Sequence, residues 1–470
     1  MSATPVLISG GTVVTAEGSF AADVLLAEGR IRDLGSGLNA EGAERVDASG
    51  LLVMPGFIDA HTHLDMPMGD LRTADDWATG TAAAAAGGTT TIVDMAIQQR
   101  GQSLEETVAA WETKATGKAI IDYGFHLVVT DATQAVLDEL PRLPQLGVSS
   151  VKLFMAYVDT PLYSDDRTLF TVMQLAAQSG LLTLVHAENG QVIAELTAQA
   201  LARGDTTPVW HALTRPPEAE AEAVGRAIRL AQLAGAPLLV VHISCADALK
   251  EVTRARHRGA NVHGETCPQY VAFDVRDLER GAFEGAKYVC SPPLRDAAEQ
   301  VALWRALQNG DIELFSSDHC PFNFETGKSL GRDDFSLIPN GIVGIEERAS
   351  VLWTLGVRTG RITPERFVSA ISTRQARLHG MLPQKGILAP GADADIVLWD
   401  PNREFEVTRG NRHGGVDHTP YEGMHMWGAP ASVYIRGRRV FDGTDVIAGT
   451  RGQYVRRNAQ PVKALDVSQT

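Results

Sequence analysis

The sequence predicts an α/β protein: a (β/α)8 TIM-like barrel with a smaller β-sandwich module formed from the N- and C-terminal segments. Short apolar runs alternate with helix-like stretches through the middle of the chain, which is typical of repeated βα units around a parallel sheet. Eight candidate strands begin near Leu52, Thr89, Tyr123, Ser150, Leu182, Pro237, Asn261 and Ile312. An open doubly wound sheet is the alternative, but no glycine-rich phosphate loop follows the first strand.

The two ends of the chain differ from the middle. Near the N-terminus, β-like runs at residues 6–8 and 23–26 are followed by glycines, a pattern that favours hairpins. Similar runs return at residues 395–399 and 431–435, so we expect both ends to form one β module. The expected division is residues 1–53 and 384–450 for this module, 54–383 for the barrel and 451–470 for a C-terminal tail.

Helix signals separate most of the candidate strands. The segment Ser103-Leu104-Glu105-Glu106 has the pattern of a capping box, which marks the start of a helix. Parallel strands need a connection of a dozen or more residues, and the spacing of the candidate strands allows one. The middle of the chain therefore satisfies the requirements of a barrel.

Composition narrows the class of protein. The 470 residues are 44% hydrophobic and 21% charged, and no apolar run approaches the roughly 18 residues that span a bilayer. A net charge of −15 without a cluster of Lys and Arg disfavours nucleic acid as a partner. Nothing near the N-terminus resembles a secretion signal, so we expect a cytoplasmic protein. Four cysteines without a CxxC pair are expected to be reduced core residues: Cys245, Cys267, Cys290 and Cys320.

Several of the buried strands end in a residue that can contribute to a metal site. The first strand ends at His61 and His63, whose imidazoles project to the same side of an extended chain and can share one cation. Because the carboxyl ends of barrel strands converge on one face, such residues from distant segments would meet in one pocket. The predicted metal-binding residues are His61, His63, Lys152, His186, His242 and Asp318.

Each of these residues also has a simpler interpretation. A single His at the end of an apolar run is more often a hydrogen-bonded core residue. Four imidazoles, an ammonium group and a carboxylate buried together without a metal would, however, cost several kcal/mol of desolvation. Because the ligands are imidazole and oxygen without thiolate, we expect two Zn²⁺ ions, with Mn²⁺ or another divalent ion as the alternative.

Lys152 is the unusual member of this set, because an ammonium group cannot bind a metal. It could instead extend out of the barrel rim or form a Schiff base, although a Schiff base would leave the histidines unexplained. Burial would favour the neutral amine, which can take up carbon dioxide to give N6-carboxylysine, whose two oxygens could bridge two cations. Two cations sharing a water would supply hydroxide near neutral pH, and Asp318 could carry its proton to a departing amide nitrogen.

The segments that contain these residues resemble the cyclic amidohydrolases of the amidohydrolase superfamily, specifically the dihydropyrimidinase and D-hydantoinase branch. The resemblance extends along nearly the whole chain. The matching segments are residues 55–67 (PGFIDAHTHLDMP), 151–157 (VKLFMAY), 185–190 (VHAENG), 241–248 (VHISCADA), 264–270 (GETCPQY), 291–295 (SPPLR), 317–323 (SDHCPFN) and 338–341 (IPNG). The resemblance also implies a homotetramer in which the tail at 451–470 packs across neighbouring subunits.

The activity that the resemblance implies is zinc-dependent hydrolysis of 5,6-dihydropyrimidines, 5-monosubstituted hydantoins or both to N-carbamoyl amino acids. The implied zinc ligands are His61, His63 and Asp318 for one ion, His186 and His242 for the other, and carboxylated Lys152 as the bridge. The implied substrate contacts are Tyr157 at the oxyanion, Ser291 and Asn340 at the imide edge of the ring through backbone groups, and Leu64, Met68 and Phe154 near the ring substituent.

Three other functions are the alternatives. A dihydroorotase would need a cation for the carboxylate of its substrate, whereas the position two after His63 is Asp65, which would repel it. An allantoinase acts on a hydantoin with a ureido substituent, but Tyr157 and residues 338–341 favour the dihydropyrimidinase branch. A non-catalytic scaffold of the same superfamily would lack part of the metal site, and every ligand position is filled here.

Overall fold

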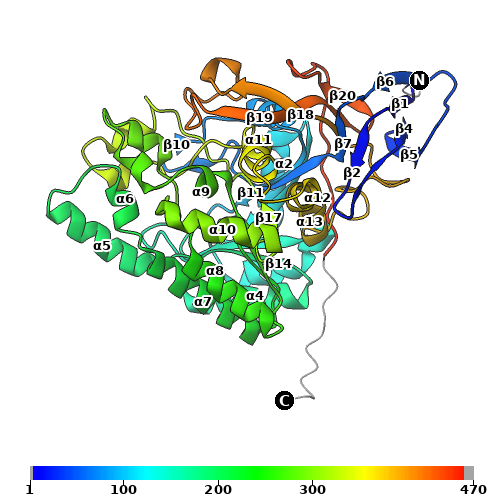
Figure 1. The fold of residues 1–470 in the computed structure, drawn as a ribbon. Coiled ribbons are helices and arrows are strands. Elements are labelled where there is room, and N and C mark those ends of the chain that lie inside the picture. The colour runs from blue at the N-terminus through cyan, green and yellow to red at the C-terminus, as the bar shows by residue number, and fades with distance from the viewer. Residues whose placement is uncertain (1–3, 460–470) are drawn as a thin grey trace.

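Eight parallel strands form the centre of the protein, whose residues 4–459 are described by a computed structural model (Figure 1). The strands are hydrogen-bonded in chain order, each to the next: β8 (Phe57–Thr62), β11 (Thr89–Ile97), β12 (Asp122–Val128), β13 (Ser150–Phe154), β14 (Leu182–His186), β15 (Leu238–Val240), β16 (Val262–Thr266) and β17 (Leu314–Phe315). A parallel bridge between Thr62 and His319, just beyond β17, closes the ring. The predicted barrel is therefore confirmed.

The first barrel strand begins later than the sequence predicts. The run that starts at Leu52 forms two strands, β7 (Leu52–Pro55) in a different sheet and then β8. Gly56 lies between them, and a Cβ atom at this position would lie 2.1 Å from Oγ1 of Thr90 on β11. This close approach requires glycine and lets the chain pass directly from the β module into the barrel.

Helices connect the barrel strands. Helix α2 begins at the predicted capping box, in which the Ser103 hydroxyl and the Glu106 carboxylate each accept a backbone N–H of the other residue. Helices α5, α6 and α7 all belong to the crossover from β14 to β15 (Figure 1). The helices are α1 (Thr79–Ala86), α2 (Leu104–Ala115), α3 (Gln134–Glu139), α4 (Asp166–Gln178), α5 (Gly190–Ala202), α6 (Trp210–Leu213), α7 (Pro217–Ala234), α8 (Ala246–His257), α9 (Pro268–Ala272), α10 (Ala297–Asn309), α11 (Arg348–Leu352), α12 (Pro364–Val368) and α13 (Arg374–Leu378).

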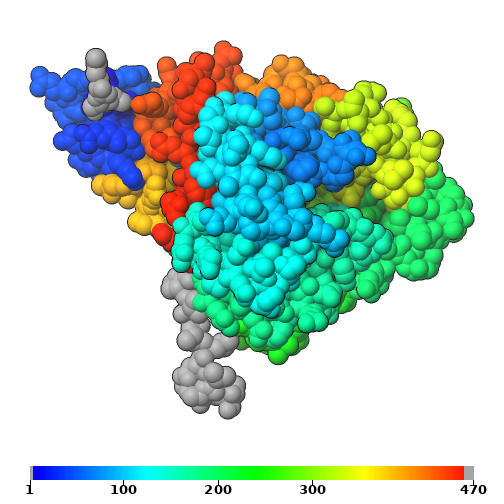
Figure 2. All heavy atoms as spheres, turned by 180° about the vertical axis from the view of Figure 1, so that it is seen from behind, coloured from blue at the N-terminus to red at the C-terminus, as the bar shows by residue number. Residues whose placement is uncertain are grey.

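The two ends of the chain form one β module, as predicted. Its four-stranded sheet comes from the N-terminal segment: β5 (Arg30–Gly35), β4 (Asp23–Ala27), β1 (Val6–Ser9) and β6 (Glu44–Asp47). Its six-stranded sheet combines both ends: β20 (Arg438–Phe441), β19 (His425–Ile435), β18 (Ile396–Glu406), β7, β2 (Thr12–Val14) and β3 (Ser19–Ala21). Val24 and Val53 share a core with Leu398 and Tyr434. Figure 2 shows these N- and C-terminal segments side by side at one end of the molecule.

The last described residues pack on the barrel of their own chain. The N–H of Val455 donates to the carbonyl oxygen of Tyr123 at 2.7 Å, and the buried Arg457 donates to Oγ of Ser150 at 3.1 Å. The first part of the predicted tail therefore lies along β12 and β13 of the same chain, and residues 460–470 lie outside the described residues. None of the helices in the described range 4–459 is long and apolar enough to cross a bilayer.

Candidate metal centre and catalytic site

The side chains predicted to bind metal lie together at the carboxyl end of the barrel. The ring centroids are 5.5 Å apart for His61 and His63, 5.5 Å for His61 and His242, and 4.5 Å for His186 and His242. Oδ1 of Asp318 lies 3.2 Å from Nε2 of both His61 and His63. Lys152, on β13, carries the amine close enough to influence the pKa values of His61 and His242. Residues from five separate stretches of chain therefore lie together at one site.

This centre is buried and leaves several polar atoms without a partner. Lys152 is fully buried and its Nζ makes no hydrogen bond among the described residues, and the same holds for Nδ1 of His63 and His242. Such atoms cost free energy unless a bound group satisfies them. His61, His63 and Asp318 also offer three ligand atoms within 4.8 Å of one another. This donor set fits a divalent cation.

Two carboxylates determine which nitrogen of an imidazole faces the centre. Oε1 of Glu265 lies 2.7 Å from Nδ1 of His61, and Oε2 of Glu188 lies 2.7 Å from Nε2 of His186. A ring nitrogen that donates to a carboxylate carries the proton, so the other nitrogen keeps its lone pair. His61 thus presents Nε2 to a cation and His186 presents Nδ1. Neither glutamate was predicted, although Glu265 lies near the carboxyl end of β16, where position alone could have indicated it.

Burial determines the protonation states in the pocket. Desolvation lowers the pKa of Lys152 to about 8 and holds the pKa values of His61 and His242 well below their usual range. For Asp318, burial opposes ionisation, but the neighbouring His61, His63 and Lys152 outweigh it, so its pKa lies below the ordinary value. At neutral pH His61 and His242 are therefore neutral, Asp318 is a carboxylate, and Lys152 is an amine that loses its proton more readily than usual.

Three residues of the site have a left-handed backbone. The φ angle is +64° for Tyr157, +42° for His242 and +51° for Asp318. This conformation is uncommon for residues with a side chain and costs roughly 1–3 kcal/mol at each position. Each residue turns the chain shortly after a barrel strand, β13, β15 or β17. Such strain concentrates at functional sites, which supports a function for all three.

Phe154 and Tyr157, two of the predicted substrate-binding residues, lie next to His186. Tyr157 is in turn linked to Ser291, and Asn340 has a buried polar atom without a hydrogen-bond partner among the described residues. The ring centroids of Phe154 and Tyr157 lie 5.5 and 5.4 Å from that of His186. Burial raises the pKa of Tyr157, whose hydroxyl is hydrogen-bonded to Ser291, so this hydroxyl stays protonated. Oδ1 of Asn340 is buried and has no hydrogen-bond partner among the described residues.

Leu64 and Met68, the other two predicted substrate contacts, lie in the segment that follows the first barrel strand. Leu64 is completely buried against helix α1, where a Cβ atom on Gly80 would lie 2.3 Å from its Cδ2 atom. Met68 is half-buried in the small hairpin of β9 (Pro67–Met68) and β10 (Leu71–Arg72). The position of Leu64 indicates core packing rather than substrate contact.

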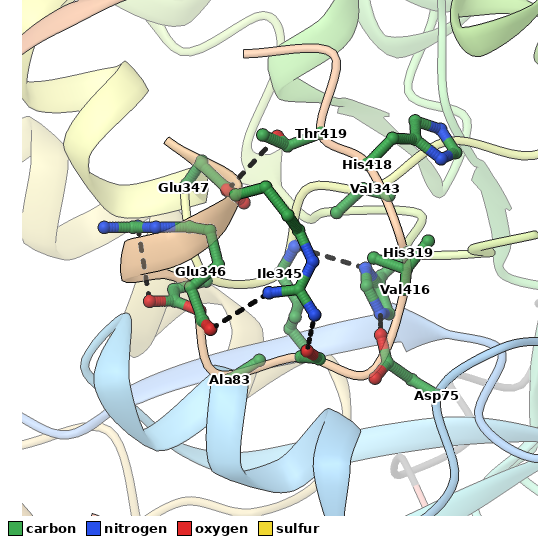
Figure 3. A pocket seen from close by; sticks show the side chains of 13 residues that line it. Asp75, Ala83, His319, Val343, Ile345, Glu346, Glu347, Val416, His418 and Thr419 are labelled. Atoms are coloured by element: carbon green, nitrogen blue, oxygen red, sulfur yellow. Dashed lines mark hydrogen bonds and ion pairs between the residues drawn. The ribbon is translucent and has the colours of Figure 1, made fainter. Parts of the chain in front are cut away.

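The residue after Asp318 is His319, whose side chain faces the carboxylate of Asp75 (Figure 3). Nε2 of His319 lies 3.0 Å from Oδ2 of Asp75, and its Nδ1 accepts the N–H of Gly344 at 3.3 Å. The N–H of Gly415 donates to Oδ1 of Asp75 at 2.5 Å. The turn that carries Asp318 is therefore tied to the loop before α1 and to a segment from the C-terminal part of the chain, which together line a small pocket.

Comparison with known proteins assigns the chain to a family. The sequence model of the Amidohydrolase family matches residues 52–440. The chain belongs to the amidohydrolase family. Among the amidohydrolases similar to it are a D-hydantoinase of Geobacillus stearothermophilus, 50% identical over 453 residues that cover 96% of each chain, and a D-phenylhydantoinase of Escherichia coli, 42% identical over 456 residues that cover 96% of this chain and 98% of the relative.

Solved amidohydrolase structures extend the similarity to the whole fold. The dihydropyrimidinase of Brevibacillus agri superimposes with a TM-score of 0.96 at 50% identity, covering 97% of this chain and 100% of that one. The L-hydantoinase of Arthrobacter aurescens superimposes with a TM-score of 0.88 at 30% identity, covering 96% of this chain and 99% of that one. The predicted membership of the dihydropyrimidinase and D-hydantoinase branch is confirmed.

The surroundings of Asp65 weaken the argument from sequence that this residue excludes a dihydroorotase. Asp65 forms an ion pair with Arg72, and its Oδ2 lies 3.7 Å from Nζ of Lys114. Because these two cations balance its charge, Asp65 would repel a substrate carboxylate less than a free carboxylate would. The case against a dihydroorotase therefore depends on the relatives named above, which are hydantoinases and a dihydropyrimidinase.

Proposed function

We propose that the protein hydrolyses the cyclic amide bond of 5-monosubstituted hydantoins, 5,6-dihydropyrimidines or both, and releases N-carbamoyl amino acids. The observation that carries this proposal is the shared pocket of His61, His63, His186, His242, Lys152 and Asp318. The relatives that are about half identical to the chain are named for these reactions. The pocket supplies the acid–base groups and the metal ligands that opening an amide ring requires.

The proposed metal site holds two divalent cations. His61, His63 and Asp318 would hold one cation and His186 and His242 the other, with carboxylated Lys152 bound to both. Zinc suits these nitrogen and oxygen ligands, and Mn²⁺ or another divalent ion could take the same positions. When bound, such a pair lowers the pKa of a water molecule that it shares and polarises the substrate carbonyl.

Carboxylation of Lys152 follows from its surroundings. Its Nζ is buried, has no hydrogen-bond partner among the described residues and has a pKa lowered to about 8, so the neutral amine is accessible near pH 7. The amine nitrogen would form a bond to the carbon of carbon dioxide and lose one proton to solvent. The product is a carbamate anion, which offers two oxygens in place of a cation that cannot bind metal.

The proton transfers are assigned to the side chains of the pocket. Asp318, ionised at neutral pH, would accept the proton of the attacking water and donate it to the departing ring nitrogen. Tyr157, whose hydroxyl stays protonated, would donate a hydrogen bond to the oxyanion. Backbone groups of Ser291 and Asn340 would hold the imide edge of the ring.

The pocket for the ring substituent is assigned to Met68 and Phe154. Phe154 stacks on His186 with an interplanar angle of 29°, and this contact supports the assignment. Leu64 would shape this pocket only indirectly, through its packing against α1. A homotetramer and a cytoplasmic location complete the proposal, and light scattering of the purified protein tests the first of these.

One assay tests the proposed reaction. Zinc-loaded protein is given dihydrouracil, hydantoin, each enantiomer of a 5-aryl hydantoin, and allantoin, and kcat/KM is compared across the series. We expect the highest values with a hydantoin or with dihydrouracil. Preference for allantoin would identify an allantoinase, and full metal loading without turnover of any ring would indicate a scaffold.

A further inference from the structure

A buried lysine outside the metal site joins two loops of the pocket. Lys328 lies in the short 3-10 helix η4 (Lys328–Gly331), ten residues after Asp318, and its side chain is completely buried. Its Nζ donates to the carbonyl oxygens of Val289 at 2.8 Å, Pro339 at 2.7 Å and Gly341 at 2.6 Å. All three N–H bonds of the ammonium group are therefore used, and each acceptor is a backbone group.

These acceptors flank the residues assigned to the imide edge of the substrate. Val289 lies two residues before Ser291, and Pro339 and Gly341 lie on either side of Asn340. The N–H of Gly341 also donates to the carbonyl oxygen of Val289 at 3.1 Å. One ammonium group thus holds together the two short segments whose backbone would contact the ring.

The lysine is itself held firmly by its own loop. The backbone N–H of Lys328 donates to the carbonyl oxygen of Asn323 at 2.9 Å. At Gly331, a Cβ atom would lie 2.2 Å from the side chain of Ile338, so η4 packs directly on the segment that leads to Asn340. The side chain of Lys328 therefore extends from a loop whose backbone is itself fixed.

No counter-charge accounts for this burial. The ion pairs found within residues 4–459 do not include Lys328, and the titratable groups with the strongest effect on it are the thiols of Cys290 and Cys320. Burial lowers its pKa to about 7, whereas the three carbonyl oxygens favour the protonated form, which alone has three N–H donors. An uncompensated buried cation is costly and rare, so its presence here calls for a function.

We infer that Lys328 is a positioning residue for substrate, which holds the backbone of residues 289–291 and 339–341 in the geometry that binds the imide edge of the ring. This inference rests on the proposed function, because it takes Ser291 and Asn340 as the substrate contacts. Lys328 acts only through this backbone, and its loss removes no acid, base or metal ligand of the proposed reaction. Loss of the lysine should therefore act mainly on KM.

The test compares Lys328→Met and Lys328→Gln with the wild-type protein, each loaded with zinc. Met keeps the volume of the side chain without a donor, and Gln keeps two N–H donors without the charge. We expect KM for hydantoin to rise about tenfold or more in Lys328→Met and less in Lys328→Gln, with kcat changed less than about threefold in both. Zinc content should stay at the wild-type value. If Lys328→Met does not fold, the comparison of Lys328→Gln with the wild type decides the test.

Hydrogen exchange gives a second readout that needs no activity. Peptides that contain residues 289–291 and 339–342 should exchange faster in the Lys328 variants, whereas peptides with His61, His63 and His242 should not change. The control is Lys385→Met, which removes another fully buried lysine far from the pocket and should leave KM at the wild-type value. An equal rise of KM in this control would show a general loss of stability and overturn the inference.

Two further results would also overturn it. One is a folded Lys328→Met protein whose KM stays within about twofold of wild type. The other is unchanged exchange in both loops. If wild-type protein hydrolyses none of the rings, the proposed function fails, and the exchange experiment still decides whether Lys328 holds the two loops.

Discussion

His61 and Glu265 are joined by a hydrogen bond of 2.7 Å between Nδ1 and Oε1, which connects the first barrel strand to the seventh. Oε2 of the same glutamate accepts the hydroxyl of Ser316 at 2.7 Å, just beyond the eighth strand. One carboxylate therefore links three strands next to the proposed metal centre. A ligand that is held in this way needs no reorientation when it binds a cation.

Glu265→Ala should weaken metal binding, because His61 then loses the partner that fixes its orientation. Removal of such a partner lowers metal affinity about 10- to 100-fold. Glu265→Gln should have a smaller effect, since the amide oxygen can still accept the Nδ1 proton. Competition with a zinc chelator measures both, and wild-type affinity in Glu265→Ala would contradict the orienting role.

Lys152→Ala should lose at least one metal ion per subunit and most of the activity. The buried amine is the only group assigned to both cations, and nothing in an alanine replaces the two carbamate oxygens. Metal analysis and turnover of a hydantoin measure the effect, and added short-chain carboxylate should restore part of the activity. Lys250→Ala is the control, because this lysine is exposed and forms a surface ion pair with Asp247. A fully metallated, active Lys152→Ala protein would rule out the bridging role.

Asp318→Asn should keep metal but lose turnover. The amide oxygen of Asn can still act as a ligand beside His61 and His63, whereas an amide cannot take up and release the proton. We expect kcat to fall at least about 100-fold, since general acid–base catalysis contributes about that much or more. Metal content near that of the wild type, measured on the same sample, separates this effect from loss of the site. Substantial turnover by the metallated variant would assign the proton transfer to another group.

The convergence of the residues assigned to the metal site could be predicted because the fold and the side-chain chemistry point to the same place. His61 and His63 alternate along one strand, and His186 and His242 end or follow apolar runs, so the barrel topology alone brings them together. Lys152 required a further chemical step, from burial to a neutral amine. These are signals that a single sequence contains.

Other parts of the site gave no such signal. Lys328 binds carbonyl oxygens that lie 39, 11 and 13 residues away, and backbone acceptors leave no trace in residue type. Leu64 belongs to the same motif as the histidines, but the motif does not show that its side chain turns towards Gly80. The start of the first barrel strand was missed because β7 and β8 form one apolar run, which the close approach of Gly56 to Thr90 divides.

Lys385 connects the barrel to the β module, and its replacement should destabilise the protein without changing KM. Its Nζ lies 2.8 Å from Asp122 on β12, and 2.6 and 3.0 Å from Asp395 and Asp393, which precede β18. These three carboxylates are close enough to hold a cation, and the lysine ammonium already occupies that position. Lys385→Met would leave buried carboxylates without this partner, which costs about 3–5 kcal/mol when one side of a buried ion pair is removed.

The destabilisation caused by Lys385→Met should depend on pH, because the pKa values of Lys385 and its carboxylate partners are shifted. Although burial opposes the charge, the three carboxylates raise the pKa of Lys385, so its stabilisation is complete below the unfolded value of about 10.4 and is lost only as the pH rises through the folded pKa. The pKa of Asp122 is lowered against burial by Lys385 and Arg436, so its contribution is present above about 3.9 and is lost as the pH falls through the folded pKa. Burial raises the pKa of Asp395, so this carboxylate takes up a proton at higher pH than Asp122 does. The difference in unfolding free energy between wild type and Lys385→Met should therefore be largest at neutral to mildly alkaline pH and shrink as the pH falls and these carboxylates take up protons. Urea unfolding across this range measures it, and a difference below about 1 kcal/mol at pH 7 would show that the network adds little to stability.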